Sequence, residues 1–199
     1  WRTCASMWTC DTFWESDVDT QDYNVQDMDR ARALIVEAGL VGAPVLMPVR
    51  NLPLVADPSR IVREVLEDLG FEVIWEDLDT GAWVERVITE DKWDLFVTST
   101  SGFKDPFIGN SVHFKKMGWI HDYADETNEM TENLDRLFSE KLTRAEQKEV
   151  TDKVQSIFFR DLPLIPFGEG FKNLAVRTRI KGYIPHESVP MYNLWIEED

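Results

Sequence analysis

The stretch DPSRIVREVLEDLGFEVIWEDL, residues 57–78, decides the fold, because it encodes a helix followed directly by a strand. Asp57 and Pro58 suit the N-cap and first position of a helix, and Gly70 suits its end. Val62, Val65, Leu66 and Leu69 fall on one face of this helix, which we expect to be buried. Residues 71–78 largely alternate apolar and polar side chains, which predicts a strand.

The same alternation extends in both directions along the chain. Helices are predicted over residues 27–38 and 80–91, and strands over 43–49 and 93–98. Helices and strands in alternation favour an α/β fold, with a mixed sheet flanked by helices. After a long connection at 103–126 come a helix at 131–139 and another from Thr143, where Thr143 and Glu146 fit a capping box. A buried strand or extended segment is predicted at 162–167, and short strands at 174–176 and 192–196.

Composition limits the function. The chain has 199 residues, 43% of them hydrophobic, and a net charge of −16. This length fits one large domain or one lobe of a larger fold. Nucleic acid and anionic membrane surfaces are poor partners for so acidic a protein. Neither a membrane-spanning run nor a signal peptide is evident, and we expect an excised or processed segment.

Sequence motifs for catalysis and metal binding are missing. The three histidines form no HExxH motif, and the two cysteines have no zinc-site spacing. The chain also has no G-x-S-x-G, P-loop or G-x-G-x-x-G motif. Carboxylates are abundant, but the sequence does not single out two of them that would be held at the defined separation that a glycosidase needs. The sequence therefore predicts neither an enzyme nor a cofactor, and a carboxylate-based hydrolase remains the enzymatic alternative.

The loop after the 93–98 strand is the best candidate for a binding site, because loops at the carboxyl ends of strands form the sites of such folds. It offers hydroxyl groups, a glycine and an aromatic wall: Thr98, Ser99, Thr100, Ser101, Gly102 and Phe103. Ordinary turn chemistry would explain the same residues. Trp8 and Trp14 are weaker candidates, since aromatic faces can stack on solutes or simply pack.

Several segments in a fixed order resemble the C-terminal part of the family 5 extracellular solute-binding proteins. They are DMDRARALIVEAG at 27–39, LGFEV at 69–73, WDL at 93–95, Asp105-Pro106, DLPLIP at 161–166 and IKGY at 180–183. The resemblance implies one lobe of a type II periplasmic-binding-protein fold over residues 1–199. The last part, from about residue 165, would return toward the first lobe.

The resemblance also implies a function. Such a protein is the substrate-binding component of an ABC importer, on the periplasmic or extracellular side of the membrane. It binds a peptide or related small solute between its lobes and delivers it to the membrane permease. Presentation of the ligand to a chemoreceptor is an alternative role. In an exported protein Cys4 and Cys10 could form a disulfide, although two unpaired thiols would also fit.

One departure from the family pattern bears on the ligand. Peptide-binding members commonly carry an Asp in the loop before the Asp-Pro dipeptide, which pairs with the α-amino group of the peptide. Gly102 or Phe103 stands there in this chain. Small peptides, opine-like and sugar-linked solutes therefore all remain open. Arg86 matches a basic position of the family and could meet a carboxylate, or could be a solvated helix residue.

Overall fold

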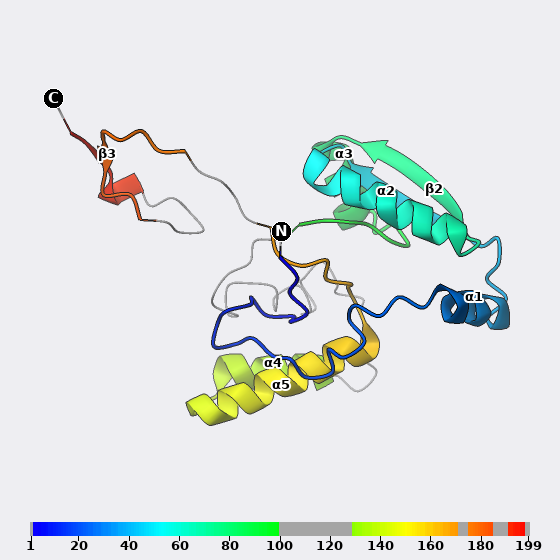
Figure 1. Ribbon diagram of the computed structural model, residues 1–199, viewed down its shortest axis with the longest axis horizontal. Helices are drawn as coiled ribbons and strands as arrows, with labels where there is room; N and C mark the ends of the chain where they lie inside the picture. Colours follow the sequence, from blue (N-terminus) through cyan, green and yellow to red (C-terminus); the bar gives the residue numbers. More distant parts are fainter. Residues whose placement is uncertain (1, 100–128, 171–174, 185–190, 198–199) are drawn as a thin grey trace. The chain divides into compact units, whose positions relative to one another are not determined.

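The computed structural model describes residues 2–99, 129–170, 175–184 and 191–197, and they fall into two compact units. One unit combines Trp1–Tyr23 with Ser101–Asp199 and has a core built on two packed helices, so we call it the helical unit. The other, Asn24–Thr100, contains the parallel strands, so we call it the sheet unit. Each unit is described by itself (Figure 1).

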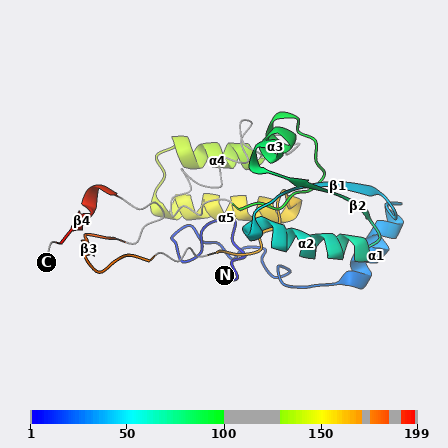
Figure 2. The ribbon, with the colours of Figure 1, turned by 90° about the horizontal axis from the view of Figure 1, so that it is seen from above.

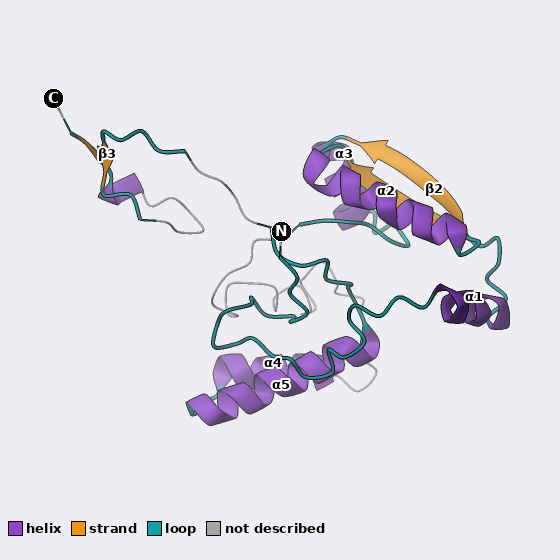
Figure 3. Ribbon diagram, viewed as in Figure 1, coloured by secondary structure: helices purple, strands orange, loops and turns teal. Residues whose placement is uncertain are grey.

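The sheet unit is built on two parallel strands joined by a helix. β1 (Pro44–Arg50) pairs with β2 (Glu72–Leu78) from Pro44↔Glu72 to Arg50↔Leu78. The connecting helix α2 (Pro53–Asp68) packs against both strands, as Figure 3 shows. Met47, Val49, Ala56 and Val97 form the buried centre of this unit. The predicted helix and strands at 43–78 are thus present, apart from one boundary.

That boundary is the start of α2. We predicted Asp57 and Pro58 as its first residues, but the helix begins at Pro53 and Pro58 lies inside it. Pro53 supplies the fixed φ that suits a first helical turn. The extra turn places Val55 and Ala56 in buried positions. Burial of these side chains offsets the backbone hydrogen bond that Pro58 cannot donate.

Helix α1 (Met28–Glu37) is capped as its sequence suggests. The side chain of Asp27 accepts a hydrogen bond from the Arg30 N–H, and Gly39 follows the helix at φ 70°. Its apolar side chains are nevertheless not covered by the described residues. No residue of α1 is buried, and Leu34 is 46% exposed.

The predicted helix at 80–91 changes type halfway. α3 (Thr80–Val84) begins at Asp79, whose side chain accepts from the Ala82 N–H. It continues into a π-helical turn, η1 (Glu85–Thr89), and the Glu90 N–H bonds to the Glu85 carbonyl five residues back. Trp83 and Val87 are both buried across this junction. Such wide turns often occur at functional sites.

The predicted strand at 93–98 does not form a regular ladder. The Asp94 and Leu95 N–H groups both donate to the Leu46 carbonyl. The Leu46 N–H donates to the Asp94 carboxylate at 2.7 Å instead of to a backbone carbonyl. This side-chain bond competes with strand pairing and explains the irregular segment beside β1.

The helical unit has α4 (Glu129–Ser139) and α5 (Arg144–Asp161) side by side, as Figures 1 and 2 both show. The predicted capping box of Thr143 and Glu146 is confirmed. The N-terminal segment packs against the helix pair through Met7 and Trp8. The core of the unit is otherwise drawn from α4 and α5: Met130, Leu134, Leu137, Val150, Val154, Ile157 and Phe158.

The chain after α5 is less regular than predicted. Of the two forms predicted for residues 162–167, the buried strand is absent: the segment has no strand pairing, and Leu162, Ile165 and Phe167 are exposed. In the described residues, strand pairing after α5 is limited to a bridge between Arg2 and Glu169 and to the hairpin of β3 (Ile180–Lys181) with β4 (Trp195–Ile196). A 3₁₀ turn, Met191–Asn193, precedes β4.

Two other expectations fall partly or wholly outside the described residues. The predicted strand at 174–176 has no strand in its described part, 175–176, and the connection at 103–126 lies outside. Among the described helices, none is long and apolar enough to cross a membrane.

Candidate functional site

The carboxyl edge of the parallel strands is the candidate binding site of the sheet unit. β1 ends at Arg50 and β2 at Leu78, which pair with each other. Val97 packs with Met47 and Val49 of β1, so Thr98 continues toward the same edge. Open α/β sheets bind their ligands at this edge.

The structure describes the first two residues of the predicted binding loop. Ser99 is exposed, whereas the Thr98 hydroxyl oxygen is buried and has no hydrogen-bond partner among the described residues. A buried polar group without a partner is costly, so such a hydroxyl is suited to bind a group supplied from elsewhere. Thr100, Ser101, Gly102 and Phe103 lie outside the described residues.

Arg86 lies on the π-helical turn and is held by two carboxylates. Its Nε is 3.0 Å from Glu76 Oε2 of β2, and its Nη1 is 3.1 Å from Glu90 Oε2. A ligand carboxylate would have to compete with these two ion pairs. Its Nη2 also donates to Glu76 Oε1 at 3.2 Å, so Arg86 ties the turn to the sheet.

Arg50 is a residue of this edge that we did not predict. Its guanidinium lies over the ring of the buried Trp83, 5.2 Å from the ring centroid. Its Nε is buried and has no hydrogen-bond partner among the described residues. A cation stacked on an aromatic face with an unused donor is well suited to bind an anion. The feature of the sequence that could have pointed to Arg50 is its place as a basic residue at the end of an apolar strand.

The two tryptophan candidates belong to the helical unit. Trp8 is 4% exposed, and its indole Nε1 donates to the Thr151 carbonyl at 3.3 Å. Its ring therefore packs in the core beneath α5. Trp14 is partly exposed and makes an edge-to-face contact with Phe13, with 5.0 Å between ring centroids. Of the two, Trp14 has the more accessible ring.

Cys4 and Cys10 are joined by a disulfide, with their Cα atoms 6.0 Å apart. Of the two possibilities that the sequence left open, the structure has the bonded one. Together with Glu169 they form a cluster of potential metal ligands in the described part of the chain. The bonded sulfurs are not available as thiolates, so the cluster is not a metal site in this state.

Sequence comparison finds one relevant relative and no matching family model. The relative is a probable peptide ABC transporter periplasmic-binding protein of Sinorhizobium fredii, 22% identical over 174 residues. The match covers 84% of this chain and 33% of the relative. The chain thus spans about a third of the curated relative that it matches.

Comparison with solved structures finds a similar fold in proteins of the same kind. A dipeptide-binding protein of a Pseudoalteromonas species, in complex with Met-Leu, has a TM-score of 0.69 at 16% identity, over 95% of this chain and 39% of its own. The oligopeptide-binding protein AppA of Bacillus subtilis, in complex with a nonapeptide, has a TM-score of 0.68 at 15% identity, over 99% and 43%.

A third solved structure has a different kind of ligand. The binding protein MoaA of A. tumefaciens, in complex with mannopinic acid, has a TM-score of 0.66 at 14% identity, over 99% of this chain and 42% of its own. The resemblance to the solute-binding proteins is therefore confirmed, and the chain has the fold of a part of the peptide-binding proteins of ABC importers.

Proposed function

We propose that the chain is the part of an ABC importer's substrate-binding protein that forms one wall of its ligand cleft. The whole protein binds a peptide or related small solute between two lobes and delivers it to the membrane permease. The observation that carries this proposal is that one chain has both a sequence match and a fold match to such proteins, along most of its length. We propose a location on the outer side of the cell membrane for the same reason.

The ligand contacts belong, in this proposal, to the loop at 98–103 and the strand edge beside it. The buried hydroxyl of Thr98 and the buried Nε of Arg50 support this assignment, because each has an unused hydrogen-bonding capacity there. Arg50 would bind a carboxylate of the ligand. Arg86 and Trp14 are secondary contacts, because Arg86 is already paired and Trp14 belongs to the other unit.

The class of solute is narrower than the fold suggests. Gly102 or Phe103 replaces the acid that would pair with an α-amino group, so recognition of the ligand would rest on its anionic end. Peptides and opine-like acids share a carboxylate, and a neutral sugar does not. The solved structures of similar fold include complexes with peptides, with mannopinic acid and with the neutral sugar stachyose, so the preference for an anionic solute rests on the residues of this chain and not on the fold. We propose that the protein binds its solute without converting it.

A thermal-shift screen of the full-length protein tests the proposal. The panel contains dipeptides, longer peptides, opines and neutral sugars, and each ligand is recovered afterwards and checked for chemical change. Binding to the native state raises the melting temperature by mass action. We expect a shift with carboxylate-bearing solutes, and recovery of the ligand intact. Absence of any shift, or turnover of a ligand, would contradict the proposal.

A further inference from the structure

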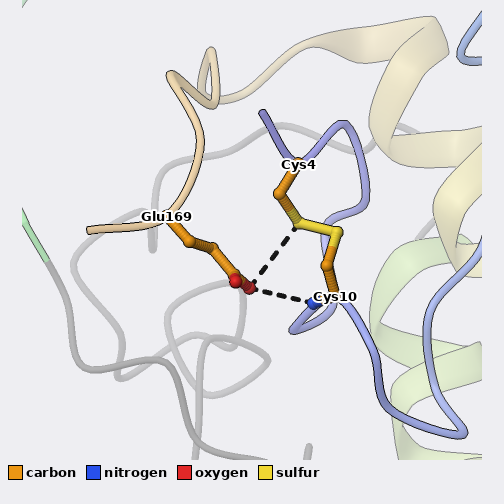
Figure 4. A group of neighbouring side chains, drawn as sticks. All are labelled: Cys4, Cys10 and Glu169. Carbon is orange, nitrogen blue, oxygen red and sulfur yellow. Dashed lines mark hydrogen bonds between the residues drawn. A yellow bond between two sulfur atoms is a disulfide. The ribbon is translucent and has the colours of Figure 1, made fainter. Parts of the chain in front are cut away.

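The disulfide of the helical unit lies against a carboxylate. Figure 4 shows Cys4, Cys10 and Glu169 together, and their ligand atoms all lie within 4.8 Å of one another. Cys4 and Cys10 are buried, and the Glu169 side chain is 22% exposed. The Cys4 Sγ lies 3.6 Å from Glu169 Oε1. A sulfur in a disulfide has no proton to donate, so this contact is not a hydrogen bond while the disulfide is intact.

Several bonds hold the Glu169 carboxylate in place. The Cys10 N–H donates to Oε1 at 2.9 Å, and Arg2 Nε donates to Oε2 at 2.8 Å. The backbones of Arg2 and Glu169 also exchange two hydrogen bonds of 2.9 Å. Arg2 further donates to the Cys10 carbonyl and pairs with Asp11. The carboxylate is therefore oriented toward the two sulfurs before any ligand arrives.

We propose that reduction of the Cys4–Cys10 disulfide converts this cluster into a zinc site. A dithiol reductant transfers two electrons and two protons to the disulfide and is itself oxidised to a disulfide. Zn²⁺ then binds both sulfurs and Glu169, and the two thiol protons are released to solvent. The fourth position of the tetrahedral ion is left to water.

One sulfur–oxygen distance and the donor set suit zinc, once reduction has let the two sulfurs separate. Zn–S and Zn–O bonds of about 2.3 and 2.0 Å at a tetrahedral angle put the sulfur and oxygen about 3.5 Å apart. Cys4 Sγ and Glu169 Oε1 are already 3.6 Å apart. Two thiolates favour zinc over calcium or magnesium, which prefer oxygen ligands.

The charges around the cluster are also favourable. Two thiolates and the Glu169 carboxylate carry three negative charges, and Zn²⁺ with the adjacent Arg2 supplies three positive ones. Arg2 is held there by its hydrogen bond to Glu169 and its ion pair with Asp11. Its contacts with the carboxylate and with the Cys10 carbonyl are those of an outer-shell residue, which orients the ligands of a metal. Asp11 also pairs with Arg2, so the occupied cluster with these partners carries one net negative charge, against three without the ion.

The test is a zinc titration of the full-length protein in its two redox states. The protein is reduced with a dithiol, which is removed without oxygen, and Zn²⁺ is titrated against a chromophoric chelator. We expect the reduced protein to withdraw one equivalent more of zinc from the chelator than the oxidised protein does. Equal zinc uptake in the two states would overturn the proposal.

Variants assign the ligands. Cys4→Ser and Cys10→Ser should each abolish the additional equivalent, and Glu169→Gln should weaken it at least tenfold, since it removes one ligand and keeps the shape. Asp17→Asn is the matched control, because it removes an exposed carboxylate of the same N-terminal segment, and it should leave zinc binding unchanged. Retention of tight binding in Cys4→Ser would contradict the assignment.

A second measurement needs no variant. Co²⁺ bound by thiolates in a tetrahedral site gives intense charge-transfer and visible absorption bands. The reduced wild-type protein should develop these bands with Co²⁺ and lose them on addition of Zn²⁺. Their absence would overturn the proposal even if the variants fail to fold. None of these readouts depends on transport or on the proposed solute.

Discussion

Arg50 is the single residue whose replacement bears most directly on ligand binding. Arg50→Gln should weaken binding of a carboxylate-bearing solute by about tenfold or more, because a hydrogen bond to a charged group contributes about 1.5–3 kcal/mol. Titration calorimetry on the full-length protein, with a ligand from the thermal-shift screen, measures the change. The expectation rests on the proposed function.

Arg63 provides the matched control for Arg50. It is also an Arg over a tryptophan ring in the sheet unit, 5.8 Å from the centroid of Trp75, and it pairs with Glu67 on the surface of α2. Arg63→Gln should leave ligand affinity unchanged. Equal losses in the two variants would mean that Arg50 acts through the stability of the unit and not through the ligand.

The sequence could not have identified Arg50, although it identified the edge on which Arg50 lies. Periodicity predicts which strands exist and where they end, and therefore which loops lie together. The significance of Arg50 depends on a tertiary contact, since Trp83, 33 positions later, covers its guanidinium. The reverse is true of Arg86. The sequence indicated it as a candidate, but its two acidic partners became visible only in the structure.

At the level of elements, ion pairs link the first turn of α4 to α5. Glu129 Oε2 accepts a hydrogen bond of 2.7 Å from Arg160 of α5, and Lys153 lies 3.5 Å from Oε1. The hydrogen bond from Arg160, followed by the charge of Lys153, lowers the pKa of the Glu129 carboxyl. A carboxyl whose pKa is lower in the folded state stabilises the protein above its unfolded pKa. This contribution is lost as the pH falls through the folded value.

Glu129→Gln should therefore melt at a lower temperature than the wild type near neutral pH. The difference should shrink at acid pH, as the pH falls below the ordinary glutamate pKa and through the lowered folded value, where the wild-type carboxyl also becomes neutral. Thermal melts followed by circular dichroism at both pH values measure this. Glu132→Gln is the control, since Glu132 is exposed on the same helix and has no ion pair among the described residues. A constant difference at all pH values would contradict the role of the charge.

The elements themselves were largely predictable, and the exceptions have local causes. The caps of α1 and α5 follow from side chains that bond neighbouring backbone groups, which a sequence displays directly. The predicted start of α2 was wrong because burial of Val55 and Ala56 outweighs the cost of an internal proline. The prediction of a regular strand at 93–98 was wrong because the Asp94 side chain takes the place of a backbone acceptor. Both exceptions depend on tertiary contacts, which periodicity does not contain.

At the scale of the whole chain, the described residues have two separate hydrophobic cores. Leu134 and its neighbours in α4 and α5 form one core, and Met47 with the β1–β2 residues forms the other. The two clusters share no residue. The sequence predicts a single lobe over residues 1–199, and in such a lobe damage to either core would spread to the other.

The variant Leu134→Ala tests whether damage to one core destabilises its own unit alone or both units. Leu134 is fully buried, so its truncation should cost about 2–5 kcal/mol. Because the cores are separate, we expect amide hydrogen exchange to accelerate across α4 and α5 and to change little in β1 and β2. Leu34→Ala, on the uncovered face of α1, is the control and should change little anywhere. Equal acceleration in β1, β2 and the helix pair would show instead that the two units unfold together, and would support the single lobe that the sequence predicts.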